Sequence, residues 1–96
     1  MKLLTKEILK TLPALYSQEN NSDPIVKVKF FHPFSNWTWY GIEYDGKDLF
    51  FGLVVGDEVE LGYFSLSELE SIKIHGLGIE RDMYFTPKPL SLFMKG

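Results

Sequence analysis

The first apolar pattern in the chain has the period of an α-helix. Its members recur at intervals of three or four residues and are Leu4, Ile8, Leu12 and Leu15. Residues at this spacing share one stripe of a helix. Thr5 is the expected N-cap, and Pro13 disfavours helical backbone at Leu12, so the helix should end there. Residues 17–24 (SQENNSDP) are polar and rich in turn formers, which predicts a loop.

The stretches that follow alternate apolar and polar residues, as β-strands do. Residues 25–32 (IVKVKFFH) alternate two lysines with apolar side chains, which predicts a half-exposed strand. Residues 36–44 and 48–55 flank Asp45-Gly46, a dipeptide typical of a two-residue type I′ hairpin turn. A three-residue turn at residues 56–58 then leads into a fourth strand, because a shorter turn would bury a carboxylate.

The two-residue turn fixes the register of the first hairpin. It places Trp39 opposite Gly52, and the next turn places Gly52 opposite Gly62. One side of the sheet then carries Trp37, Trp39, Phe50, Phe64, Gly41, Gly52 and Gly62. The other, more apolar side carries Tyr40, Ile42, Tyr44, Phe51, Leu53, Leu61 and Tyr63. Glu43 falls on the side of the tryptophans.

The side that carries the tryptophans also holds three glycines. A glycine inside a strand costs about 0.5 to 1 kcal/mol and is tolerated where something approaches the backbone or a ring covers it. The pattern predicts a shallow glycine floor rimmed by aromatic rings. Two interpretations are open. Either the apolar stripe of the N-terminal helix or the C-terminal segment packs there as core, or the rings form an exposed platform for a partner.

Residues after the fourth strand predict a second helix and an extended end. Ser65 and Glu68 form a capping-box pattern, so a short helix should begin near Ser65 and end by Ser71. Residues 72–79 (IKIHGLGI) are a candidate last strand, and residues 86–90 (TPKPL) should be extended because prolines cannot donate to a sheet. The expected fold is α+β, an antiparallel meander of four or five strands with the N-terminal helix on one face and a short helix after strand four.

The composition fits one domain over residues 1–96. Ninety-six residues with 45% apolar content are too few for a second core. The chain has no cysteine, which excludes disulfides, thiolate zinc sites and cysteine nucleophiles. The sequence shows no apolar run of transmembrane length and no signal-peptide pattern, so we expect a cytoplasmic protein that does not enter the membrane.

The net charge of −3 is distributed unevenly. The middle of the chain carries the acids Glu43, Asp45, Asp48, Asp57, Glu58, Glu60, Glu68 and Glu70 against the single base Lys47. A block of one sign should attract a basic surface and repel nucleic acid, so we expect no direct binding to nucleic acid. The alternative, that these are solvated charges at turns and helix ends, is also open.

No catalytic residue, metal site or cofactor site can be assigned. His32 and His75 are the only histidines, and no acids lie near them at metal-ligand spacing such as H-E-x-x-H. The serines lie in no G-x-S-x-G elbow, and the glycines at 76 and 78 lack the strand-to-helix pattern and lysine of a phosphate loop. We therefore expect a non-enzymatic protein without a cofactor.

Four stretches of the sequence are distinctive: LLTKEILKTLPALYSQE, SNWTWY, ELGYFSLSELES and GLGIERDMYFTPKPLS. They resemble a family of small bacterial proteins known only as domain of unknown function 2958, and the resemblance extends from Leu3 to Leu92. It implies a mobile-element setting, since the family is found on plasmids and phages, and it brings no activity, cofactor or catalytic residue. The chain departs from the family pattern mainly in the loop after Leu15 and at SIKIH.

The first hypothesis for function is a protein-binding module of a mobile genetic element, such as an acidic inhibitor of a host defence nuclease of the anti-CRISPR or anti-restriction type. Aromatic rings anchor protein interfaces. The expected partner-binding residues are Trp37, Trp39, Phe50, Phe64, Asp57, Glu58 and Glu60. Two alternatives are open: a small-ligand binder or accessory enzyme that uses a surface of Trp39, Gly52 and Gly62, and a structural homodimer joined through the sheet edge or the aromatic face.

Overall fold

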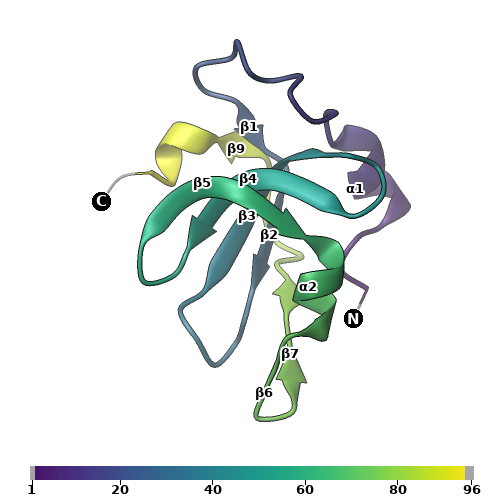
Figure 1. Cartoon of the computed structure of the whole chain (residues 1–96), viewed down its shortest axis with the longest axis vertical. Helices are drawn as coiled ribbons and strands as arrows, with labels where there is room; N and C mark the ends of the chain where they lie inside the picture. The colour runs from purple at the N-terminus through teal and green to yellow at the C-terminus, as the bar shows by residue number, and fades with distance from the viewer. Residues whose placement is uncertain (1, 95–96) are drawn as a thin grey trace.

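The chain folds around a five-stranded antiparallel sheet. The computed structural model describes residues 2–94 and gives the strand order β5-β4-β3-β2-β8. The strands are β2 (Val28–Phe31), β3 (Thr38–Tyr44), β4 (Leu49–Val55), β5 (Val59–Ser65) and β8 (Glu80–Arg81). Because β2 to β5 are neighbours both in the chain and in the sheet, they form the predicted meander, and β8 is added beside β2 (Figure 1). The α+β class is confirmed.

Short elements surround this sheet. They are α1 (Lys6–Thr11), β1 (Ile25–Val26), α2 (Leu66–Ser71), β6 (Lys73–Ile74), β7 (Leu77–Gly78), β9 (Lys88–Pro89) and the 3-10 helix η1 (Leu90–Leu92). The candidate last strand over residues 72–79 is instead the hairpin β6-β7, which projects beyond α2 in Figure 1. Its turn lies at His75 and Gly76, which have φ of 52° and 80°. Glycine adopts this left-handed backbone readily, and the turn at these two residues reverses the direction of the chain.

The predicted strand over residues 25–32 is divided in two. β1 leaves the main sheet and pairs with β9, whereas β2 stays beside β3. Between them, the Lys27 N–H donates to the Gly41 carbonyl at 2.8 Å. Val26, Val28 and Phe30 are all buried, so the alternation identified the inward side chains even though it did not show the break.

Both helices begin at the side chains expected to cap them. The Thr5 hydroxyl accepts from the Ile8 N–H at 3.2 Å, and the Ser65 hydroxyl accepts from the Glu68 N–H at 3.1 Å. α1 ends where expected, because its C-cap Leu12 has extended backbone ahead of Pro13. No helix in the part of the chain that the structure describes has the length and apolar character needed to cross a membrane.

The predicted register between β3 and β4 is wrong. Trp39 pairs with Val54, not with Gly52. The turn is longer than two residues because the Asp45 carboxylate organises it through one oxygen, Oδ1. This oxygen accepts from the N–H groups of Lys47, Asp48 and Leu49 at 2.8, 2.8 and 3.0 Å. An aspartate at the start of a turn stabilises it in this way, and the dipeptide signal alone did not reveal the longer loop.

A β-bulge at Ile42 separates two registers in this hairpin. An extra residue in one strand reverses the faces of the residues that follow it. Tyr44 therefore packs against Phe50, with ring centroids 4.4 Å apart. Glu43 turns to the opposite side and is buried there. Both lie on the faces opposite to those predicted.

The two sides of the sheet are named here by their residues. The tryptophan face carries Trp39, Phe50 and Phe64, and the leucine face carries Leu53, Leu61 and Tyr63. On the tryptophan face, the cover comes from Leu3, Leu4, Ile8, Leu12, Leu69, Ile72 and Ile79. Phe50 and Phe64 stack beneath it, with centroids 5.1 Å apart and ring planes 15° apart. Of the two interpretations of this side, the structure supports the first, in which other segments of the chain pack on it as core.

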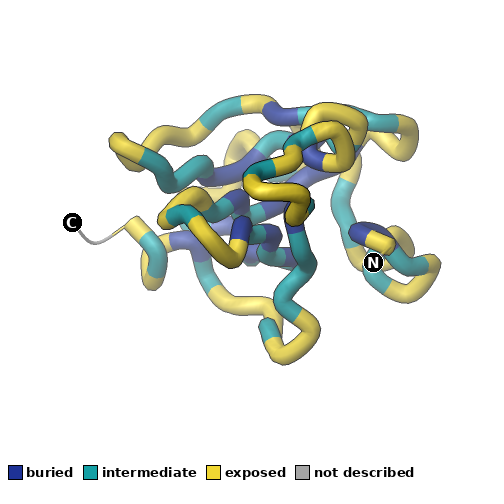
Figure 2. The backbone as a smooth tube through the Cα atoms, turned by 90° about the horizontal axis from the view of Figure 1, so that it is seen from below, coloured by how far each residue is buried: buried dark blue, intermediate teal, exposed yellow. Residues whose placement is uncertain are grey.

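The leucine face is covered only in part. Its cluster consists of Val26, Ile42, Leu53 and Leu90, with Tyr40, Val55, Phe85 and Phe93 packed against it. This cover comes from β1 and the C-terminal segment, which lie over β3 and the nearer part of β4. In β5, the side chains of Val59, Leu61 and Tyr63 are 48%, 45% and 51% exposed. In Figure 2, where the backbone is coloured by residue burial, most buried positions lie in the middle of the molecule and most exposed ones around it.

A row of three glycines crosses β3, β4 and β5. Gly41 pairs with Gly52, and Gly52 pairs with Gly62 as predicted. A Cβ at Gly52 would lie 1.8 Å from the Tyr40 carbonyl oxygen, whereas a Cβ at Gly62 would meet nothing within 4 Å. Glycine is required at position 52 because the backbone of β3 approaches it closely next to the bulge. This close approach accounts for the glycine at position 52, which is itself buried.

Candidate functional site

The acidic block is divided among several places. Asp45 organises the β3-β4 turn, and Asp48 holds the start of α2 by accepting from the Ser67 N–H at 2.9 Å and from its hydroxyl at 2.7 Å. Glu43 is buried on the leucine face. These carboxylates are engaged by the chain's own groups. Three exposed acids, Asp57, Glu58 and Glu60, gather instead at the β4-β5 turn.

A hollow of about 400 Å³ lies beside this turn. It is lined by Trp37, Val54, Asp57, Glu58 and Glu60. Trp37 directly precedes β3, which pairs with β4, and the end of β4 leads into the acidic turn. The meander therefore brings together four of the seven predicted partner-binding residues.

Trp37 forms the aromatic wall of the hollow. Its side chain is 39% exposed, compared with 8% for Trp39, and the two ring centroids lie 6.0 Å apart with ring planes at 30°. A Cβ at Gly56 would come within 2.6 Å of the Trp37 ring. The indole thus rests on the Gly56 backbone with Trp39 beside it, and it keeps a partly open surface.

Glu58 and Glu60 concentrate negative charge at the hollow. A hydrogen bond with the Glu58 side chain, and then the repulsion between the two charges, raise the pKa of the Glu60 carboxyl. No lysine or arginine of residues 2–94 lines this hollow. An aromatic face beside paired carboxylates is suited to a guanidinium or ammonium group.

The other three predicted partner-binding residues belong to the core. Phe50, Phe64 and Trp39 are 0%, 6% and 8% exposed. The expectation of an open aromatic platform is therefore corrected. The sequence pattern placed these rings on one face, and one of its two interpretations had the stripe of Leu4, Ile8 and Leu12 as their cover. The structure has this cover and adds Leu3, which the pattern did not reveal.

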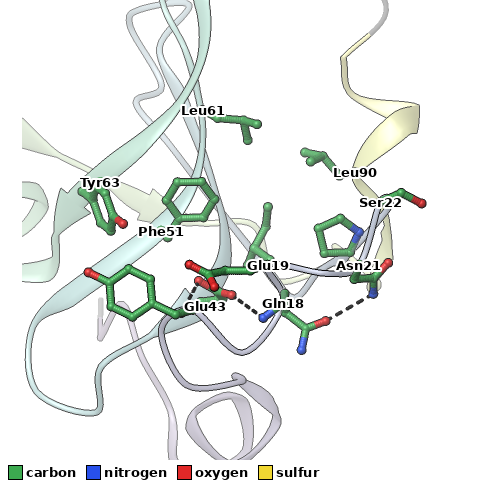
Figure 3. Close-up of a pocket in the computed structure, with 12 residues that line it drawn as sticks. Gln18, Glu19, Asn21, Ser22, Glu43, Phe51, Leu61, Tyr63 and Leu90 are labelled. Atoms are coloured by element: carbon green, nitrogen blue, oxygen red, sulfur yellow. Dashed lines mark hydrogen bonds between the residues drawn. The ribbon is translucent and has the colours of Figure 1, made fainter.

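A second hollow, of about 410 Å³, lies on the leucine face and was not predicted from the sequence. Figure 3 shows Phe51, Leu61 and Tyr63 on one side of it and Leu90 on the other. The loop that contains Gln18 borders it. The hollow lies where the cover of the leucine face ends, so its position depends on how the C-terminal segment packs.

Buried Glu43 holds the loop at this second hollow. Its two carboxylate oxygens accept from the N–H groups of Tyr16 at 3.0 Å and Gln18 at 2.8 Å. Tyr16 has a φ of 69°, unusual for a residue with a side chain. A hydrogen bond with the Tyr16 side chain is the main cause that raises the pKa of the Tyr63 hydroxyl. Sequence reasoning missed this arrangement because the bulge moved Glu43 to the other face.

His32 has a structural role. Its Nδ1 accepts from the Phe34 N–H at 3.0 Å, so the ring hydrogen lies on Nε2, which donates to the Leu77 carbonyl at 2.9 Å. The buried imidazole thereby ties the β6-β7 hairpin to the end of β2. Within residues 2–94, no group of three or more histidine, cysteine, aspartate or glutamate side chains is placed to hold a metal ion.

No curated protein and no solved structure matches this chain. A family model does match, over residues 3–96, and its description is "Protein of unknown function (DUF2958)". The match spans nearly the whole chain and agrees with the family that the distinctive stretches of the sequence resemble. The chain therefore belongs to the DUF2958 family.

Proposed function

We propose that this protein is a non-enzymatic module that binds a partner protein through the hollow beside the β4-β5 turn. One observation carries the proposal: the partly exposed ring of Trp37 meets the carboxylates of Asp57, Glu58 and Glu60 in one hollow. Tryptophan is among the residues that contribute most to binding at protein interfaces.

An arginine of the partner suits this hollow best. Its planar guanidinium can stack on the Trp37 indole and donate two parallel hydrogen bonds to a carboxylate, whereas a lysine ammonium acts as a point charge. A cation placed between Glu58 and Glu60 also relieves the repulsion that raises the pKa of Glu60. The volume of about 400 Å³ is in the range that holds a small ligand or one long side chain.

The charge of the hollow points to the class of partner. Proteins that hold nucleic acid present arginines and lysines, which an acidic surface can engage in place of phosphate. In its finer form, the proposal is an inhibitor that occupies the basic channel of a host defence nuclease. The mobile-element setting implied by the sequence resemblance supports this form.

A defined peptide tests the chemistry of the hollow. An arginine-containing peptide should shift tryptophan fluorescence and bind more tightly than the same peptide with lysine in place of arginine. Trp37→Ala, or Glu58→Lys combined with Glu60→Lys, should weaken binding by at least about tenfold, as expected for the loss of an interface anchor. Binding should also weaken as the pH falls through the raised pKa of Glu60, because the protonated carboxyl no longer attracts the cation.

Purification of the tagged protein from host cells tests the partner. A protein with a basic surface should accompany the wild type and be lost with the same variants. Two matched controls should retain it: Phe34→Ala removes a ring that is 65% exposed elsewhere, and Glu70→Lys reverses an exposed charge on α2. If Trp37→Ala and the double reversal keep both the arginine peptide and the partner, the hollow is not the binding site.

A further inference from the structure

β5 is an open edge of the sheet. Within residues 2–94 it pairs only with β4, along seven residues. The Gly56 N–H donates to the Glu58 carbonyl at 2.9 Å, and the Leu66 N–H donates to the Asp48 carbonyl at 2.8 Å. These bonds mark the two ends of the β4-β5 ladder.

In an antiparallel ladder, opposite residues alternate between pairs that exchange hydrogen bonds and pairs that do not. The two end bonds join Gly56 to Glu58 and Asp48 to Leu66, so the even-numbered residues of β5 are the ones that bond to β4. The backbone N–H and C=O groups of Val59, Leu61 and Tyr63 therefore point away from β4. Their side chains lie on the leucine face and are about half exposed, at 48%, 45% and 51%. The edge thus offers backbone donors and acceptors together with a row of apolar side chains.

We infer that β5 pairs with β5 of a second copy of this chain, antiparallel, with the two-fold axis at Leu61. In this register Leu61 lies opposite its own counterpart, and Val59 lies opposite Tyr63 of the other copy. Apolar side chains then face each other along the leucine face. The same strand of each copy then forms both sides of the contact, as in a self-complementary two-fold interface.

The charges of β5 fit the same register. Glu60 is the charged residue of this strand, and like charges directly opposite each other would be destabilising. With the axis at Leu61, Glu60 lies opposite Gly62 of the other copy. Gly62 has open space at its Cβ position, so the carboxylate meets neither another acid nor a side chain.

The opposite edge of the sheet has the protections that β5 lacks. β8 is two residues long, and the turn after it is held by the Asp82 N–H on the Lys29 carbonyl at 2.9 Å and by an ion pair between the Lys29 and Asp82 side chains at 3.6 Å. Short length and charge are common protections of edge strands. β5 has neither a proline nor a bulge, and its one charge lies on the other face.

Sedimentation at several concentrations tests the pairing. One strand and three side chains make an interface at the small end of the range, below about 1,200 Å². The apparent mass should therefore rise from 11.1 kDa at about 1 µM toward twice that value at about 100 µM. Leu61→Lys should remain monomeric at both concentrations. Leu9→Lys, at a residue of similar exposure (42% against 45%), should dimerise like the wild type.

Cysteine cross-linking tests the register, because the natural chain has no cysteine. Paired Cα atoms about 5.5 Å apart can form a disulfide, so Leu61→Cys should cross-link to its own copy under mild oxidation. Val59→Cys should cross-link when mixed with Tyr63→Cys but not by itself. Leu9→Cys is the control for random collision.

A wild type that stays monomeric at 100 µM would overturn the inference, as would a Leu61→Cys variant that cross-links no faster than Leu9→Cys. Circular dichroism of each variant separates loss of pairing from loss of folding. Trp37 lies beside Trp39 on the tryptophan face, whereas the paired side chains of β5 lie on the leucine face. Trp37→Ala should therefore leave the dimer mass unchanged, so failure here is distinct from failure of the arginine site.

Discussion

The two faces of one sheet differ in how they are closed. The tryptophan face is covered by the segment before and within α1, by α2 and by Ile79, and its three central rings are almost fully buried. The leucine face is covered over β3 but left open over β5. Both faces carry apolar side chains from β3, β4 and β5. What differs is where the segments outside the meander pack, and this decides which face is core and which is available to other molecules.

The largest expected effect is the loss of a buried ring from the tryptophan face, to be compared with the loss of an exposed ring from the leucine face. Phe50→Ala should lower the free energy of unfolding by about 3 to 5 kcal/mol, because Phe50 is fully buried and its ring contacts those of Phe30, Tyr44 and Phe64. Tyr63→Ala, on the open face, should cost about 1 kcal/mol or less. Urea denaturation at about 1 µM protein measures both. Equal losses would mean that the leucine face is as closed as the tryptophan face.

A smaller effect is expected within the glycine row. Gly52→Ala should destabilise the fold by about 2 to 3 kcal/mol, because its Cβ would meet the Tyr40 carbonyl oxygen at 1.8 Å and the backbone must shift. Gly62→Ala has open space and should be neutral or stabilising by up to about 1 kcal/mol. Thermal unfolding compares the pair. The close approach at the bulge is refuted if Gly52→Ala is as stable as Gly62→Ala.

The smallest effect concerns the turn that sets the register of both faces. Hydrogen bonds from the N–H groups of Asp48, Lys47 and Leu49 lower the pKa of the Asp45 carboxyl below its usual value of 3.8. A carboxyl with a lowered folded pKa stabilises the fold above its unfolded pKa, and this contribution is lost as the pH falls through the folded value. The free energy of unfolding, measured from about pH 5 downward, should therefore decrease more steeply for the wild type than for Asp45→Asn. Identical slopes would contradict the role of Asp45.

Local signals in the sequence were sufficient for much of the fold. The caps at Thr5 and Ser65, the meander and the three-residue turn between β4 and β5 each depend on neighbours in the chain, and all were predicted. The β3-β4 register was not, because the three hydrogen bonds to Asp45 and the bulge at Ile42 compete with the two-residue turn that the same dipeptide favours elsewhere.

The candidate site was predictable in its residues and only partly in its geometry. Trp37 and the acids of the β4-β5 turn were identified by residue type, and the strand order brings them together. Which rings stay exposed depends on packing between segments distant in sequence, such as Leu3 against the tryptophan face, and a single sequence carries no direct signal for such contacts. The hollow on the leucine face was missed for the same reason.

Each core cluster joins residues from near the start of the chain to residues near its end. Leu3 and Leu4 share a cluster with Ile79, and Val26 shares one with Leu90. During synthesis, the central hairpins can form as they emerge from the ribosome, but neither layer can be completed until the final third of the chain is available. Both layers should therefore be completed only after Ile79 and Leu90 have left the ribosome, and until then the open rings of the sheet are exposed to chaperones.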